Sequence, residues 1–148
     1  MKTEISQQTQ PGFSLLELMV TMAVMVVFFT IAVPGFTSMI VSSDLKSGQN
    51  DLFSALKLAK TVARTQNTKI KISLLNTSNE IVLRYPDNSV YKTVSLPHKV
   101  KPTIDAEYQF DSMGMVDAIG LITLKSQQST TRSKAVRINS LFGQIILI

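Results

Sequence analysis

One long apolar stretch near the amino terminus constrains the fold of this 148-residue sequence more than any other feature. Eighteen of the 24 residues from 13 to 36 are apolar, and Glu17 is the only charged residue among them. Because a helix needs about 20 such residues to cross a bilayer, the sequence predicts a single membrane-spanning helix. A secretory signal cut after Ala32 is the alternative, but signal cores usually have about 7–15 apolar residues, and an internal carboxylate would weaken one.

A short polar segment, residues 1–12, precedes the apolar stretch and is too short to fold by itself. Lys2 and the terminal ammonium are partly offset by Glu4, whereas no basic residue follows the stretch until Lys46. Basic residues are enriched on the cytoplasmic side of membrane helices. The charge pattern therefore favours a cytoplasmic amino terminus.

Glu17 is the unusual residue of the apolar stretch, because an ionisable group in a membrane helix is costly and by default suggests a function. A glutamate near the membrane surface that simply reaches water is the plainer explanation. The surrounding residues, Gly12-Phe13-Ser14-Leu15-Leu16-Glu17-Leu18, resemble the processing and methylation motif of type IV pilins and pseudopilins. In that family a prepilin peptidase cuts after the glycine, the new terminal phenylalanine is methylated, and the glutamate is needed for assembly.

The resemblance implies roles for four residues. It implies leader cleavage between Gly12 and Phe13, N-methylation of Phe13, an assembly role for Glu17, and a helix-kinking role for Pro34. Cleavage would create a buried ammonium at Phe13, with which Glu17 of a neighbouring subunit would pair. Opposite charges attract strongly where the dielectric is low, and either charge alone would be costly there. Such a pair would set the axial register between neighbouring helices.

Beyond Gly35 the apolar pattern changes from continuous to periodic. Six apolar residues fall on one helical face, spaced about three, four and seven apart: Val41, Leu45, Leu52, Leu56, Ala59 and Ala63. Phe53 flanks this face, and Gly48 is its weak point. We therefore expect one helix from about Phe13 to about Gln66, whose second half, from residue 37, packs against a sheet.

Basic residues gather beside that apolar face in a narrow sector formed by Lys46, Lys57, Lys60 and Arg64. Asp44 and Asp51 lie well round the helix from them. A solvated face is the simpler interpretation, and contact with an acidic partner subunit or with phosphates is the alternative. The spacing alone does not choose between them.

From Lys69 onward the pattern shortens to strand length. The expected strands are Lys69–Leu75, Glu80–Tyr85, Val90–Leu96, Lys99–Ile104, Glu107–Phe110, Leu121–Lys125, Lys134–Asn139 and Gln144–Ile148. The first two read as a hairpin, and Pro97 and Pro102 favour edges or turns. Short strands alone make a marginal core, so the helix face would complete it. The expected fold is α+β: a long amino-terminal helix, half in the membrane and half amphipathic, packed on a small antiparallel sheet or sandwich (residues 67–148).

A second resemblance concerns the β region. The run Phe110-Asp111-Ser112-Met113-Gly114, followed by a strand, a polar loop, Ala135–Asn139 and Gly143, is similar to the GspH/FimT family. Its members are minor pseudopilins of type II secretion systems and minor pilins of type IV pili. The sequence has no Cys, and so it lacks the disulfide-bounded loop of many major pilins, which agrees with a minor subunit.

Some members of that family bind DNA during uptake through a basic carboxy-terminal segment with a Gly-Arg pair. Here Gly143 is followed by Gln144, so that pair is missing. The residues after Gly120 nonetheless include four cations and no acid: Lys125, Arg132, Lys134 and Arg137. Arg132 and Lys134 lie in or beside the polar stretch 126–133, which reads as a flexible hairpin tip. Phosphate contact needs clustered cations on a reachable loop, and a soluble loop on a basic protein is the alternative.

No catalytic constellation is apparent in the sequence. His98 is the only histidine and lies in an expected turn, and the glycines are scattered rather than grouped in a phosphate-binding loop. The local group of acids is better explained by turns and strand edges than by paired catalytic carboxylates: Asp105, Glu107, Asp111 and Asp117. We therefore expect a chain that is not an enzyme and has no metal or cofactor.

The resemblances imply a minor pilin of a type IV pilus that primes filament assembly or lies at its tip. A minor pseudopilin of a type II secretion system and a DNA-binding minor pilin of natural transformation are the alternatives, and the basic balance, a formal net charge of +5, favours the pilus. The implied partners are other pilin subunits, prepilin peptidase and the inner membrane, with DNA added in the third case. The implied domain plan is a cleaved leader (1–12), a transmembrane and assembly segment (13–36) and a periplasmic domain (37–148).

Overall fold

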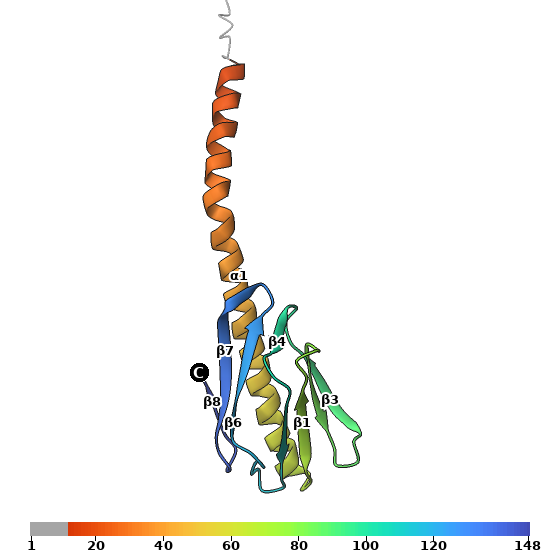
Figure 1. The fold of residues 1–148 in the computed structure, drawn as a ribbon. Coiled ribbons are helices and arrows are strands. Elements are labelled where there is room, and N and C mark those ends of the chain that lie inside the picture. The colour runs from red at the N-terminus through yellow and green to blue at the C-terminus, as the bar shows by residue number, and fades with distance from the viewer. Residues whose placement is uncertain (1–11) are drawn as a thin grey trace, which may run out of the picture. The chain divides into compact units, whose positions relative to one another are not determined.

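The computed structural model describes residues 12–148, apart from the side chain of Thr130 (Figure 1). Residues 1–11, which make up nearly all of the expected leader, lie outside the described residues. The chain forms two units, one ending at Ser38 and the other from Met39 to Ile148. The second is called the carboxy-terminal domain here.

Helix α1 runs from Leu15 to Thr65, close to the expected limits at Phe13 and Gln66. Its amino-terminal part, over residues 15–40, is exposed at every position. Buried residues begin at Val41 and continue to Ala63. The change from a continuous to a periodic apolar pattern in the sequence therefore corresponds to a change from exposed to half-buried helix.

Eight strands follow the helix and form two antiparallel sheets, so the expected α+β fold is confirmed. The strands are β1 (Ile70–Leu74), β2 (Glu80–Arg84), β3 (Val90–Ser95), β4 (Val100–Pro102), β5 (Ala106–Phe110), β6 (Gly120–Ser126), β7 (Ser129–Ser140) and β8 (Gln144–Leu147). One sheet has the order β3-β2-β1-β5 and the other β4-β6-β7-β8. The expected first hairpin is confirmed by the antiparallel pairing of β1 with β2.

A single cluster of buried side chains joins the helix to both sheets. All six residues of the expected apolar face belong to it: Val41, Leu45, Leu52, Leu56, Ala59 and Ala63. The strands contribute alternate residues, as in β1, where Ile70, Ile72 and Leu74 are buried. This period of two is typical of sheets with one face on the core.

Gly48, expected as a weak point of the helix, is instead a packing position. A Cβ atom there would lie 3.0 Å from Val100 Cγ1 and 3.4 Å from Pro97 Cδ. The missing side chain therefore lets the start of β4 approach the helix closely.

Two expectations about strand limits were wrong. The polar stretch 126–133 is not a flexible tip, because β7 begins at Ser129 and leaves only Gln127 and Gln128 as the turn. Pairing with β6 continues to the Ser126–Ser129 pair, which extends the strand through this polar sequence.

Strand β4 is shorter than expected, because Lys99 has a φ of 72° and lies in the preceding turn. Since β4 pairs with β6 alone, Pro102 does lie on an edge strand, as expected.

Replacing Leu56 with Ala tests the role of the helix in the core. Leu56 is fully buried, so we expect Leu56→Ala to lower the free energy of unfolding by about 2–5 kcal/mol through lost burial and a residual cavity. Urea unfolding of the full chain in detergent micelles, followed by far-UV circular dichroism, measures this change. Ser54→Ala, at an exposed position two residues earlier, is the control and should shift stability by no more than about 0.5 kcal/mol. Equal effects of the two changes would contradict the packing described.

Candidate functional site

The residues of the expected processing motif also form the start of helix α1. The Glu17 backbone N–H donates to the Ser14 side-chain Oγ at 3.2 Å and to the Ser14 carbonyl oxygen at 3.1 Å. With the helix starting at Leu15, Ser14 is its N-cap and Glu17 its third residue. A Ser with a Glu three residues later is a common arrangement at helix starts, and a carboxylate in the first turn is favoured by the helix dipole.

The cleavage and methylation residues lie directly before this cap. Phe13 is 83% exposed, and Gly12 is exposed with open space around its Cα. The bond between them therefore lies just outside the first turn of the helix. The structure keeps this bond apart from packed elements, and it places the Glu17 carboxyl within one helical turn of the terminus that cleavage would create.

The helix over residues 15–38 is long and apolar enough to cross a membrane. Its hydroxyl groups turn back onto the helix: Thr21, Thr30 and Thr37 each donate to the carbonyl three residues earlier, at 2.9, 2.7 and 3.0 Å. A polar group in hydrocarbon needs an internal partner, and these bonds provide one. Pro34 lies inside the helix and, since it lacks an N–H, leaves the carbonyl of Thr30 without its usual helical donor.

The second resemblance motif forms a turn between β5 and β6. The Asp111 carboxylate Oδ1 accepts from the backbone N–H groups of Met113 and Met115, at 3.0 and 2.8 Å. Gly114 has a φ of +80°, and a Cβ there would lie 2.7 Å from Arg64 Cδ on the helix. The left-handed backbone therefore favours glycine here, and the Arg64 side chain packs over it.

The other glycine of that motif, Gly143, lies beside the first. Its φ is +67°, and an added Cβ would lie 2.6 Å from the Gly114 carbonyl oxygen. Lys60 on the helix donates its ammonium protons to the carbonyl oxygens of Phe142 and Gly143, at 2.9 and 3.0 Å. One cation of the basic helix sector is thus a structural clamp that holds the β7–β8 turn to the helix, a role that the sequence did not indicate.

Gln49 is a second polar contact that sequence reasoning missed. Its amide Nε2 is buried and donates to the carbonyl oxygens of Ala135 and Ile148, at 2.7 and 2.9 Å. The spacing carried a signal, because Gln49 falls four residues after Leu45 on the apolar face. A polar residue at such a position must find partners, and it finds them on β7 and at the end of β8.

The four cations considered for DNA contact lie on the neighbouring strands β6 and β7. Lys125, Arg132 and Lys134 lie at the end of the sheet where β6 turns into β7, and Lys125 is opposite Ser133 in the strand register. Arg132 donates to the Ser42 hydroxyl on the helix. Arg137 lies three residues after Lys134 on β7, about 10 Å away at the usual rise per residue.

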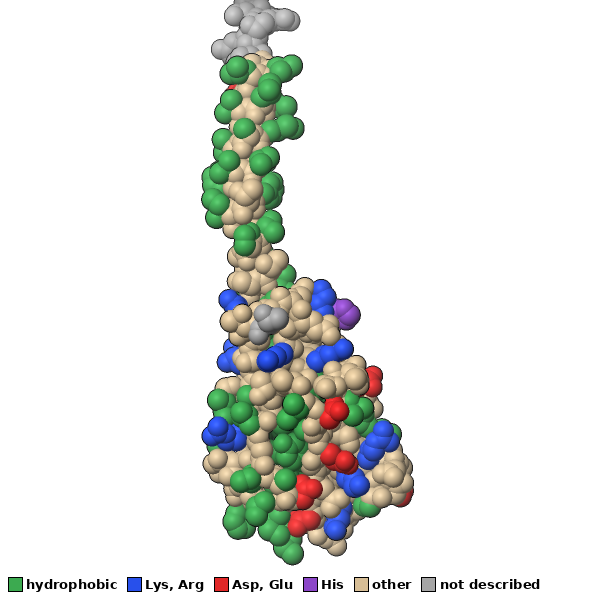
Figure 2. Space-filling view, viewed as in Figure 1, with side chains coloured by type: hydrophobic (Ala, Val, Ile, Leu, Met, Phe, Trp, Pro, Cys, Tyr) green, Lys and Arg blue, Asp and Glu red, His purple; other side chains and the backbone are tan. Residues whose placement is uncertain are grey.

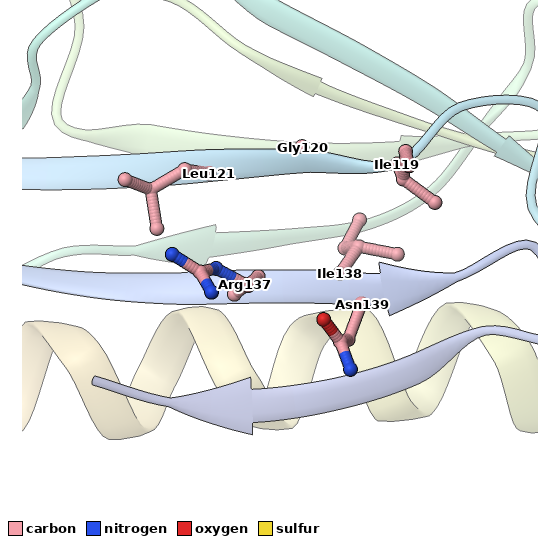
Figure 3. A pocket seen from close by; sticks show the side chains of 6 residues that line it. All are labelled: Ile119, Gly120, Leu121, Arg137, Ile138 and Asn139. Atoms are coloured by element: carbon pink, nitrogen blue, oxygen red, sulfur yellow. The ribbon is translucent and has the colours of Figure 1, made fainter.

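Arg137 instead belongs to a shallow pocket on β6 and β7. Leu121 is its partner in the register, and the two side chains lie side by side on the neighbouring strands (Figure 3). Ile119, Gly120, Ile138 and Asn139 complete the lining.

A Cβ added to Gly120 would collide with the Tyr108 hydroxyl. Burial raises the pKa of Tyr108 above its usual value, and the nearby Asp117 carboxylate adds to this effect.

The acids named as a local group have turn and edge roles, as expected. Asp105 accepts from the Asn76 backbone N–H at 2.6 Å, Asp117 accepts from that of Gln109 at 2.9 Å, and Asp111 holds the turn already described. Glu107 lies 3.9 Å from Lys71 Nζ at the surface. Among the described residues, no group of three or more metal-binding side chains occurs, and His98 is exposed in the turn before β4.

Comparison with known proteins identifies the motif and the fold. Residues 8–33 match the family model of the prokaryotic N-terminal methylation motif, and no curated protein matches the sequence. The structure of the type IV minor pilin FimU from Pseudomonas aeruginosa is similar with a TM-score of 0.61 and 16% identity, over 72% of this chain and 90% of that one. The minor pseudopilin EpsH from the type 2 secretion system of Vibrio cholerae is similar with a TM-score of 0.58 and 12% identity, over 71% and 96%.

The chain therefore carries a type IV pilin-like N-methylation motif on a pilin-like α+β fold. At these identities the similar structures establish the fold, and they include a pilus subunit and a secretion-system subunit alike.

The clamp made by Lys60 is testable by removing its ammonium group. We expect Lys60→Met to lower the free energy of unfolding by about 1–2 kcal/mol, because two carbonyl groups lose a charged donor. Lys46→Met, at an exposed helix position, is the matched control and should change stability by at most about 0.5 kcal/mol. Urea titration of both full-length variants in detergent measures the difference, and equal stabilities would show that the clamp has no structural role.

Proposed function

We propose that the chain is a minor pilin of a type IV pilus, which primes filament assembly or lies at the filament tip. The observation that carries the proposal is the N-methylation motif at the start of an exposed, apolar helix. In this proposal the leader, residues 1–12, is removed between Gly12 and Phe13, and the new amino group of Phe13 is methylated. Prepilin peptidase and other pilin subunits are the corresponding partners.

The exposed apolar helix supports the proposal because its side chains would need to be covered first by the membrane and then by other subunits. Large side chains such as Phe28, Phe29 and Ile31 are 64–74% exposed, and water around them is unfavourable. The inner membrane would cover them first, with the amino terminus cytoplasmic and the carboxy-terminal domain periplasmic. Neighbouring subunits of the filament would cover them afterwards.

Glu17 supports the proposal through its place in the helix. After cleavage, the Phe13 ammonium would stand directly before the Ser14 cap, and Glu17 would lie one turn further along. Both charges would enter an apolar filament core, where pairing between subunits offsets their desolvation. Pro34 would permit a local kink or unwinding of the helix, since the hydrogen bond to Thr30 is already missing.

A minor pseudopilin of a type II secretion system is the second candidate. It is favoured by the similarity to EpsH, whose TM-score is close to that of FimU.

The DNA-binding alternative has weaker support. No aromatic residue is among those that line the pocket beside Arg132 and Lys134, so stacking of bases has no platform there.

The assembly role of Glu17 is tested by a neutral replacement. We expect Glu17→Gln to remain in the membrane but to be at least about tenfold depleted from sheared filaments, because the Phe13 ammonium of a neighbour loses its partner. Immunoblots of the filament and membrane fractions measure the ratio, and the same blots on pilus and pseudopilus preparations separate the two candidate systems. Glu80→Gln, an exposed acid on β2, is the control. Normal incorporation of Glu17→Gln into both the pilus and the pseudopilus would contradict the assembly role of Glu17.

A further inference from the structure

The end of the carboxy-terminal domain that is nearest along the chain to the apolar segment has a strongly basic surface. Three cations lie at the β6–β7 end of the second sheet, and the Gln127 backbone N–H donates to the Lys99 carbonyl at 2.8 Å, which brings the preceding turn to the same place. Lys99, Lys125, Arg132 and Lys134 are called the cationic rim.

Residues 120–148, which form β6, β7 and β8, contain four cations and no carboxylate side chain. On the adjacent helix, Asp44 and Lys46 have opposite charges. Figure 2 shows Lys and Arg side chains around the upper end of the domain on this face, whereas the Asp and Glu side chains lie further down, among other Lys and Arg side chains. The net charge of +5 is therefore unevenly distributed.

Chain connectivity limits how far this rim can be from the membrane. Arg132 donates to the hydroxyl of Ser42, and Lys134 lines the same pocket as Ser42 and Leu45. Ser42 follows the last residue of the apolar segment, Phe36, by only six residues, a reach of about 22 Å even for a fully extended chain. The chain therefore keeps Ser42, which Arg132 contacts, within that distance of Phe36.

We propose that the cationic rim binds the phosphate groups of acidic phospholipids in the membrane that holds the apolar segment. Arg and Lys side chains near an anionic membrane surface are attracted to it over about one Debye length. Such contact would orient the domain against the bilayer before assembly, and it would be released when the subunit leaves the membrane. The inference rests on the membrane insertion proposed for residues 13–36.

Membrane binding fits the rim better than DNA binding does. A duplex offers phosphates along many ångströms, so a protein that tracks it needs an extended line of cations. Here Lys99, Lys125, Arg132 and Lys134 gather at one end of the second sheet, and Arg137, three residues beyond Lys134, is the next cation of β7. Headgroups at a membrane surface are dense in two dimensions, and a compact rim suffices for them.

The absence of Cys from the sequence permits a clean test with one introduced label. Gln128, exposed in the β6–β7 turn, is changed to Cys in the full chain and labelled with a nitrobenzoxadiazole fluorophore. The protein is reconstituted into phosphatidylcholine vesicles with or without roughly 30% phosphatidylglycerol, each containing a lipid with a nitroxide on its headgroup. Quenching of the fluorophore then reports its proximity to the headgroups.

We expect quenching to be at least about twofold stronger with phosphatidylglycerol, and to fall to the phosphatidylcholine level at about 0.5 M NaCl, where charges are screened. The triple change Lys125→Gln, Arg132→Gln and Lys134→Gln should abolish the difference. The matched control, Lys57→Gln, Lys69→Gln and Lys92→Gln, removes the same charge from exposed positions elsewhere and should preserve it. The lipid and salt comparisons use the unaltered rim, so they hold even if a variant folds poorly.

Two outcomes would overturn the inference. Equal quenching in both vesicles would do so, and so would a response of the label to duplex DNA but not to phosphatidylglycerol, which would make the rim a nucleic-acid site. A second label at Met25→Cys, quenched by a nitroxide on the acyl chains, reports insertion independently. Insertion without a lipid-dependent response at Gln128→Cys contradicts the rim alone, whereas failed insertion contradicts the proposed function and the inference together.

Discussion

The fold depends on the burial of one face of helix α1 against two sheets that have no adequate core without it. Each sheet has four strands, and in β1, for example, alternate residues form a buried face, which needs another element to cover it. The stripe from Val41 to Ala63 provides the missing apolar surface. Gly48 and Gln49 fix how it docks, the first by close approach and the second by hydrogen bonds to β7 and β8.

The same helix has a different role before Met39, where its side chains are exposed. Ser14 caps it and Glu17 occupies its first turn, so the residues of the methylation motif are also those that begin the helix. A chain of this kind has its stability in the carboxy-terminal domain and its proposed assembly chemistry at the amino terminus. Gly114 and Gly143, in the β5–β6 and β7–β8 turns, contribute to the stability of the carboxy-terminal domain.

The sequence allowed the fold class, the helix limits and the apolar stripe to be predicted, because periodicity directly reports which residues face a core. Other features depend on partners that are distant in sequence. The bonds of Lys60 to Phe142 and Gly143, and the length of β7, follow from tertiary pairing that no local pattern reveals. The basic residues after Gly120 were visible, but only the strand register separates Arg137 from the rim.

The central claim is that the chain matures by cleavage before Phe13 and methylation there. Cleavage creates the ammonium group with which Glu17 of a neighbouring subunit would pair. Mass spectrometry of the protein purified from cells that contain a prepilin peptidase tests this most directly. The account predicts an amino-terminal peptide that begins with Phe13 and carries an additional methyl group. An amino terminus at Val33, after the alternative signal site at Ala32, or an unprocessed chain would contradict it.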